Sequence, residues 1–176
     1  MAALGTRAHL VCQGLEDLGF RDNSFDVIYC RGVLMHIPAW EEALGHLCRV
    51  LKPNGMLVIL ELNHTSIETC IVRAVRQLRA GQSRMVETVS GLEFWSDEHG
   101  KPFVARIANV ASLLDQLRNC GVQKVGRFAT EFWDINRFPS GFLRNLAIRF
   151  NQLWFLLHLP SFPSMGNAII GQKKNP

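Results

Sequence analysis

Several side chains that can do chemistry follow two apolar segments, at the points where those segments end. Arg31 follows Phe25–Cys30, and Asn63 and His64 follow Met56–Leu62. The planar guanidinium of Arg31 can pair with a carboxylate, and Asn63 and His64 can contact a polar substrate. The alternatives are an exposed loop arginine and two residues that merely precede the next helix.

A histidine lies shortly after the first of these segments, at His36. Because an imidazole has an ordinary pKa of about 6.5, it can accept a proton from a nucleophilic hydroxyl or amine near neutral pH. A structural histidine is the alternative. His36 is therefore our candidate for a catalytic base.

The apolar patterns predict the elements that position these residues. Phe25–Cys30 is rich in β-forming residues, and apolar residues recur at helical spacing from Trp40 to Leu51. Residues 52–55 (KPNG) predict a turn, and Met56–Leu62 predicts a strand buried on both faces. Since ligands bind at the carboxyl ends of strands in open α/β sheets, both strands should deliver their last residues to one rim.

The rest of the chain continues an α/β order with less regular spacing. His9–Cys12 is a weak strand candidate, Thr65–Glu68 reads as a capping box, and residues 82–104 predict an irregular excursion over the sheet. The other predicted elements are a helix from Ile67 to before Gly81, a helix from Asn109 closed by Gly121, a strand near Val122–Phe128, a helix at Phe142–Leu159 and a last strand at Asn167–Gly171.

The helix predicted at Phe142–Leu159 has two interpretations. Its apolar residues favour a helix that covers the sheet as part of the core. Because Arg144 and Arg149 lie among them, a surface-seeking amphipathic helix is the alternative.

Composition limits the function classes. With 176 residues, 48% hydrophobic and 19% charged, the chain should form one globular domain rather than a disordered regulator or a rod. The net charge of +4 comes from scattered cations, so nucleic acid is not an expected partner. The five cysteines never form Cys-x-x-Cys, which disfavours a disulfide framework and a metal site and favours a cytoplasmic location. No secretory signal or transmembrane segment is predicted.

Four short blocks occur in order between residues 13 and 62. They are Leu15-Glu16-Asp17-Leu18-Gly19-Phe20, Asn23-Ser24-Phe25-Asp26-Val27-Ile28-Tyr29, Gly32-Val33-Leu34-Met35-His36-Ile37 and Arg49-Val50-Leu51-Lys52-Pro53-Asn54-Gly55. Together they resemble the class I, Rossmann-like S-adenosylmethionine-dependent methyltransferases, and most closely the type 11 branch that acts on small molecules. The resemblance weakens over 63–106, where such enzymes vary with substrate, and returns faintly over 107–176.

The resemblance implies a fold, a cofactor and a set of site residues. The fold would be α/β, a partial doubly wound sheet that is mostly parallel with an antiparallel last strand. The cofactor would be S-adenosylmethionine. The matching positions are Leu15, Glu16, Cys30, Arg31 and Gly32 for the cofactor, His36 for catalysis, and Asn63 and His64 for the substrate.

Two cofactor-binding features of that family are missing from the pattern: a glycine-rich turn after the first strand and an acidic residue after the second. None of the fourteen glycines is two positions from another, so no Gly-x-Gly occurs. We therefore expect residues 1–176 to form a single domain that corresponds to the carboxyl-terminal portion of a methyltransferase domain.

Two functions are consistent with these observations. The first is methyl transfer from S-adenosylmethionine to an oxygen, nitrogen or carbon nucleophile of a small molecule. The alternative is a non-catalytic methyltransferase-like protein that binds a partner or a membrane surface. Self-association through an exposed sheet edge is a further expectation.

Overall fold

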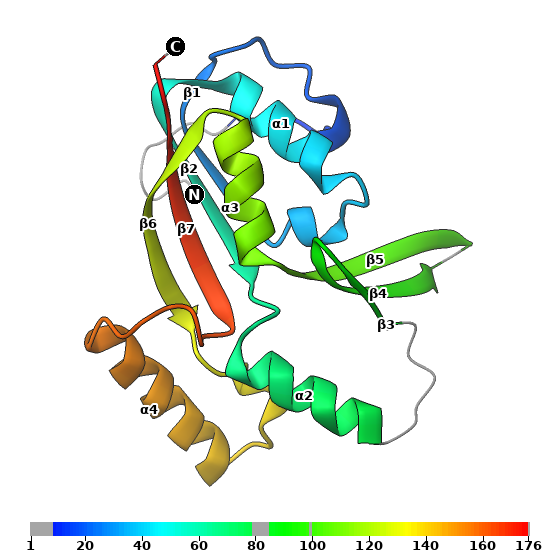
Figure 1. Cartoon of the computed structure of the whole chain (residues 1–176), viewed down its shortest axis with the longest axis vertical. Coiled ribbons are helices and arrows are strands. Elements are labelled where there is room, and N and C mark those ends of the chain that lie inside the picture. Colours follow the sequence, from blue (N-terminus) through cyan, green and yellow to red (C-terminus); the bar gives the residue numbers. More distant parts are fainter. Residues whose placement is uncertain (1–8, 79–84, 99, 176) are drawn as a thin grey trace.

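A four-stranded mixed sheet forms the centre of the molecule. The computed structural model describes residues 9–78, 85–98 and 100–175. The strands are β1 (Phe25–Arg31), β2 (Leu51–Leu62), β6 (Val122–Glu131) and β7 (Gly166–Lys173), in the spatial order β1-β2-β7-β6 (Figure 1). β1 pairs with β2 in parallel, and β7 runs antiparallel to both β2 and β6. The predicted α/β class and antiparallel last strand are confirmed, and the expected parallel character is limited to the shared direction of β1, β2 and β6.

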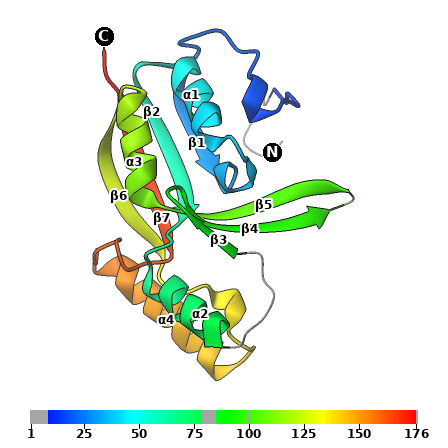
Figure 2. The same ribbon diagram turned by 45° about the vertical axis from the view of Figure 1, so that its right-hand side comes forward.

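Two helices cover one face of this sheet. They are α1 (Trp40–Val50) and α3 (Val110–Asn119), which lie against the same side of the strands (Figure 2). Their apolar residues share one buried core with Leu57, Ile59 and Ile169 of the sheet. Along β2, buried residues alternate with half-buried ones. The prediction that Met56–Leu62 is buried on both faces is therefore wrong, because helices cover only one side of β2 in the described chain.

Arg49 ties the end of α1 to the segment that precedes β1. Arg49, near the end of α1, donates hydrogen bonds to the carbonyls of Leu18 and Phe20, at 2.7 and 2.8 Å, and pairs with Asp22 at 2.7 Å. Residues 52–55, predicted as a turn before the strand, lie within β2, where Asn54 has a positive φ of 63°. The pairing of β1 with β2 shifts in register at this segment.

A second, antiparallel sheet replaces the irregular segment predicted for 82–104. Its strands are β3 (Met85–Thr88), β4 (Gly91–Glu98) and β5 (Lys101–Ala108). Gly91 begins β4 with a φ of +130°, a conformation that favours glycine. The expected irregularity is wrong, because Leu92 and Val104 are buried on opposite faces of this sheet and both faces therefore pack against other parts of the chain.

Other local predictions are corrected at their boundaries. His9–Cys12 forms no strand, and the first described element is the short 3-10 helix η2 (Leu15–Asp17). α2 (Ile67–Leu78) is capped by Ser66 rather than Thr65, since the Ser66 Oγ accepts a hydrogen bond from the Thr69 N–H at 3.1 Å. The helix expected from Asn109 is α3, and the Asn109 side chain caps it by accepting from the N–H groups of Ala111 and Ser112.

The last helix differs most from its predicted packing. α4 spans Phe142–Leu156, and Ala147 is its one fully buried residue. Phe142, Leu146 and Leu153 are exposed by more than half. The core interpretation is wrong, because α4 lies with α2 beyond the end of the sheet rather than across its face (Figure 1).

Candidate functional site at the carboxyl ends of the strands

The carboxyl ends of β1, β2 and β6 meet at one edge of the sheet, because these three strands run in the same direction. A pocket of about 280 Å³ lies at this edge. Its lining consists of Arg31, Gly32, Met35, Leu60, Glu61, Leu62, Thr130, Glu131 and Gly166. We call it the rim pocket. Of the predicted site residues, it brings together Arg31 and Gly32.

Gly32 makes the turn that opens this pocket. Its φ is +61°, and its N–H donates to the Leu60 carbonyl at 3.1 Å, so the turn is tied to β2. The short 3-10 helix η3 (Leu34–His36) follows at once. A residue with a side chain would be strained at this φ, so glycine suits the position.

Arg31 presents a free cation at the pocket. Within the described chain its guanidinium makes no ion pair or hydrogen bond of the kind that fixes Arg49 or Arg106. Its charge lowers the pKa of Glu131, although burial together with the charges of Asp134 and Glu68 gives that carboxyl a net raised pKa. An exposed guanidinium beside a turn can form an ion pair with the carboxylate of a ligand.

Glu61 is the most unusual side chain of the rim pocket. It is 5% exposed, and neither of its carboxylate oxygens has a hydrogen-bond partner among the residues that the structure describes. Burial raises the pKa of Glu61 to about 7, against the opposing charge of Arg106 and the nearby backbone N–H groups of Leu34 and Met35. A carboxyl group with this pKa can take up or release a proton near neutral pH.

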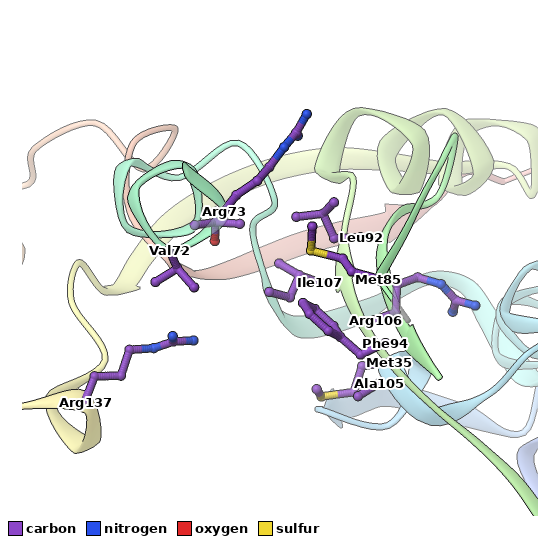
Figure 3. Close-up of a pocket in the computed structure, with 11 residues that line it drawn as sticks. Met35, Val72, Arg73, Met85, Leu92, Phe94, Ala105, Arg106, Ile107 and Arg137 are labelled. Atoms are coloured by element: carbon purple, nitrogen blue, oxygen red, sulfur yellow. The ribbon is translucent and has the colours of Figure 1, made fainter. Parts of the chain in front are cut away.

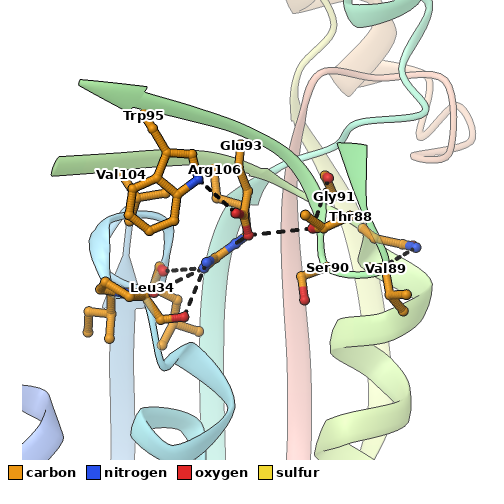
Figure 4. Close-up of polar contacts among 12 residues, drawn as sticks. Leu34, Thr88, Val89, Ser90, Gly91, Glu93, Trp95, Val104 and Arg106 are labelled. Carbon is orange, nitrogen blue, oxygen red and sulfur yellow. Dashed lines mark hydrogen bonds and ion pairs between the residues drawn. The ribbon is translucent and has the colours of Figure 1, made fainter. Parts of the chain in front are cut away.

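A buried ion pair fixes the second sheet onto the turn that carries the site. Arg106 of β5 pairs with Glu93 of β4 at 2.9 Å, and it donates to the carbonyls of Leu34 and Ile37 at 3.2 and 3.1 Å (Figure 4). The Trp95 indole N–H also donates to Glu93, at 3.0 Å. The segment after Gly32 is therefore held from above by β4 and β5.

A second cavity, of about 180 Å³, lies between this sheet and α2. Met35 lines both this cavity and the rim pocket, so the two spaces are neighbours. Figure 3 shows Met85, Leu92, Phe94 and Ile107 gathered around it with Met35. An apolar ligand group would fit here next to the polar rim.

The structure places the other predicted cofactor residues away from the rim pocket. Leu15 and Glu16 lie in η2, where Leu15 packs against the core and Glu16 is exposed. Cys30 is buried in β1, and this burial raises the pKa of its thiol to about 11. Their roles in cofactor binding stay predictions.

His36 faces the second sheet rather than the rim pocket. Its Nδ1 lies 3.1 Å from the Val104 carbonyl, which can only accept, so Nδ1 carries the proton. The ring also stacks on Phe103 with centroids 4.9 Å apart. The catalytic role of His36 stays a prediction, and its contacts fit a residue that anchors η3.

Asn63 and His64 differ in how their side chains are used. Asn63 is fully buried, and its amide donates to the Phe162 carbonyl at 2.7 Å and accepts from the Thr65 hydroxyl at 2.9 Å. The Nδ1 of His64 is buried and has no hydrogen-bond partner in the described ranges. In this structure Asn63 joins the loop after β2 to the loop that contains Phe162. The substrate-binding roles of Asn63 and His64 stay predictions.

Sequence reasoning missed Glu61, Glu131 and Arg106. Glu61 is the one acid inside the apolar run 56–62, and a charge in a buried strand was the signal available for it. Glu131 and Arg106 gave no local signal, because their positions depend on which strands end together.

The comparisons with known proteins agree with this architecture. Residues 2–59 match the family of methyltransferase domains. The chain is 33% identical over 92 residues to a 24-methylenesterol C-methyltransferase of Oryza sativa, covering 52% of this chain and 23% of that protein. It is 41% identical over 59 residues to a demethylmenaquinone methyltransferase of Staphylococcus haemolyticus, covering 34% of this chain and 25% of that protein. The chain thus spans about a quarter of these relatives.

Solved structures show the same fold. A methyltransferase from Methanosarcina mazei, described as dependent on S-adenosylmethionine, superposes with a TM-score of 0.56 at 17% identity, covering 93% of this chain and 66% of that one. The chain is therefore similar in sequence to methyltransferase domains over residues 2–59, and it shares its fold with a methyltransferase of known structure.

Proposed function

We propose that the chain contributes to methyl transfer from S-adenosylmethionine to a small-molecule acceptor at the rim pocket. The observation that carries the proposal is the convergence of Arg31, Gly32 and the buried Glu61 at the carboxyl ends of parallel strands. This is where open α/β sheets bind ligands. The similarity of residues 2–59 to methyltransferase domains supports the reaction type.

The residues present fit one end of the cofactor. The free guanidinium of Arg31 pairs with the carboxylate of its methionine portion, and the Gly32 turn lets the backbone approach closely. No Gly-x-Gly occurs, so we further propose that these 176 residues supply the carboxyl-terminal portion of the methyltransferase domain. When bound, the cofactor supplies an activated methyl group on a sulfonium.

Glu61 handles the proton of the acceptor in this proposal. Bound S-adenosylmethionine would supply the methyl group to the acceptor, and S-adenosylhomocysteine would be the product that is released. If the acceptor atom carries a proton, a Glu61 carboxylate with a pKa of about 7 receives it. The pocket geometry supports this role, since both Glu61 oxygens are free of partners in the described residues.

The acceptor is an apolar ring compound. The cavity beside the rim pocket is lined by Met35, Met85, Leu92 and Phe94, and two relatives are named for methylating a sterol and a menaquinone precursor. Apolar cavities with a few polar groups at one end bind such molecules in a fixed orientation.

Calorimetric titration with S-adenosylhomocysteine tests the proposal. We expect saturable binding to the chain, and a loss of about tenfold or more in affinity for Arg31→Gln, because a charge-assisted pair is removed. Arg118→Gln, on the exposed surface of α3, is the matched control and should bind like the unaltered chain.

Two outcomes would contradict the proposal for these residues. Absence of binding heat would mean that the rim pocket by itself holds no cofactor. Equal affinity for Arg31→Gln and the unaltered chain would remove Arg31 from the cofactor site.

A further inference from the structure

α4 exposes a continuous apolar face to solvent. Phe142, Leu146, Leu153 and Leu156 are exposed by 80, 54, 53 and 71%. These residues and Arg149 recur every three or four positions, so they form one stripe along the helix. A helix of a monomeric protein normally buries such a stripe, and its exposure marks an interaction surface.

The apolar surface continues beyond the helix. His158 adopts a φ of +51° after α4 ends, and Leu157 and Phe162 in the following loop are also exposed by more than half. The Trp154 indole N–H donates to the Pro160 carbonyl at 3.2 Å, which ties this loop to the helix. We call α4 and residues 157–162 the apolar ledge.

The side-chain charges of the segment that carries the apolar ledge have one sign. Asp134 is the last acidic residue of the sequence, so residues 135–176 carry cations alone. Arg149 lies within the stripe, and Arg144 lies on the same helix. Arginine side chains beside exposed leucine and phenylalanine are typical of helices that lie in the interface of an anionic bilayer.

We propose that the apolar ledge docks on the surface of a bilayer that contains anionic lipids. The leucine and phenylalanine side chains enter the headgroup boundary, and Arg149 and Arg144 pair with lipid phosphates and carboxylates. α4 has 15 residues, fewer than the roughly 20 that a membrane-spanning helix needs, so in this proposal it lies along the surface. None of the described helices is long and apolar enough to cross a membrane.

A second copy of the chain fits this surface less well. In a symmetric pair, Arg149 would face apolar side chains and the cations of its partner, and the ledge offers no acid to compensate it. Anionic lipid supplies that compensation at every position along the stripe. The charge pattern therefore favours lipid.

A groove connects the ledge with the proposed site. This groove, of about 490 Å³, lies between α2 and α4 and is lined by Ile71, Phe138, Leu146 and Phe150 among others. Val72 and Arg137 line both the groove and the cavity under the second sheet. Lipid docking itself requires neither cofactor nor acceptor, so it stands or fails separately from the proposed methyl transfer.

Co-sedimentation with vesicles tests the docking. We expect the chain to bind phosphatidylcholine vesicles that contain about 30% phosphatidylserine and to bind pure phosphatidylcholine far more weakly at about 0.1 M salt. The double variant Leu146→Ser, Leu153→Ser should bind at least tenfold more weakly, because two exposed apolar anchors are removed. Arg149→Gln should weaken binding to the anionic vesicles by about fivefold.

Matched controls lie elsewhere on the surface. Val86→Ser on β3 removes an exposed apolar side chain, and Arg118→Gln on α3 removes an exposed cation. Both should bind like the unaltered chain. Thermal unfolding checks that each variant is folded, and Arg149→Gln still tests the proposal if the leucine variant is not.

The proposal is overturned by any of three results. The first is absence of binding to the anionic vesicles, and the second is equal binding by the Arg149→Gln variant and its control. The third is a dimer in sedimentation velocity that the leucine variant dissociates, combined with no vesicle binding, because the ledge would then be an interface between copies of the chain.

Discussion

Glu61 is a buried carboxyl group near the carboxyl end of β2, and its neighbours in that strand are apolar. Its strand places it where β1, β2 and β6 end, and burial raises its pKa to about 7 against the opposing effect of the Arg106 charge. Glu93, in the second sheet, is also buried, but it receives hydrogen bonds from Arg106 and Trp95. A buried carboxyl group without such partners destabilises the fold. Such destabilising groups are found mainly at functional sites.

The raised pKa of Glu61 predicts a pH-dependent stability. An unfolded Glu61 ionises near pH 4.5 and the folded one near pH 7, so the folded protein holds a proton that the unfolded chain has released between these values. The contribution of Glu61 to the free energy of unfolding is therefore fully present below pH 4.5 and is lost as the pH rises through about 7. Glu61→Gln should therefore raise the free energy of unfolding at pH 8 by on the order of 2–3 kcal/mol.

Urea unfolding of both proteins at pH 4.5 and pH 8 measures this effect. The gain should vanish at the lower pH, and Glu42→Gln on the exposed side of α1 should give no comparable gain. A Glu61→Gln variant that is destabilised equally at both pH values would show that Glu61 is stabilised by a partner.

At the scale of elements, the second sheet is an anchor for the turn after β1. β4 and β5 deliver Glu93 and Arg106, and Arg106 donates to backbone carbonyls on both sides of η3. Stacking of His36 on Phe103 adds a contact between η3 and β5. Strands β4 and β5, where the resemblance to methyltransferases is weak, therefore position the turn after β1, where the resemblance is clear.

Breaking the Arg106–Glu93 pair should be costly. Arg106→Leu leaves the Glu93 carboxylate buried without its cation, and we expect a loss of about 3–5 kcal/mol in the free energy of unfolding. Replacing both residues by Met should cost clearly less, because no uncompensated charge remains. Urea unfolding gives the values, and hydrogen exchange at residues 33–38 reports the release of the turn.

The exposed Arg118–Asp115 pair provides the comparison. Arg118→Gln should change stability by less than about 1 kcal/mol, because solvent screens that pair. A loss for Arg106→Leu as small as this would show that the second sheet is held by apolar contacts alone.

At the scale of the whole molecule, β7 is the last strand in the sequence but occupies an interior position in the sheet. β7 pairs with both β2 and β6, and its Ile169 and Asn167 are fully buried. Lys173 Nζ also donates to the Cys48 and Leu51 carbonyls, at 2.9 and 2.7 Å, where α1 ends. The carboxyl-terminal segment therefore joins both halves of the chain.

Removal of β7 should abolish the cooperative fold. A chain that ends at Met165 leaves β2 and β6 without their shared partner and exposes the core below α1 and α3, so thermal unfolding should lose its single sharp transition. A chain that lacks only the last two residues is the control and should unfold like the full chain. A sharp transition in the shorter chain would show that β1, β2, α1 and α3 suffice for folding.

The sequence by itself determined the α/β class, the bounds of most elements around the first two strands, and Arg31 and Gly32 at the rim. Local patterns suffice for these features, because helix spacing, turn residues and strand composition act within a few positions. The blocks from 15 to 55 also indicated the methyltransferase class.

Only the tertiary structure decided which residues share the site and which apolar faces stay exposed. Glu61 and Glu131 are seventy residues apart and meet because parallel strands end together. The Asn63 side chain is buried and hydrogen-bonded to the loop at Phe162, whereas the apolar residues of α4 are exposed. Both outcomes depend on which distant segment lies opposite the side chain. Local periodicity identifies the apolar face of a helix, but contacts between distant segments determine whether anything covers it.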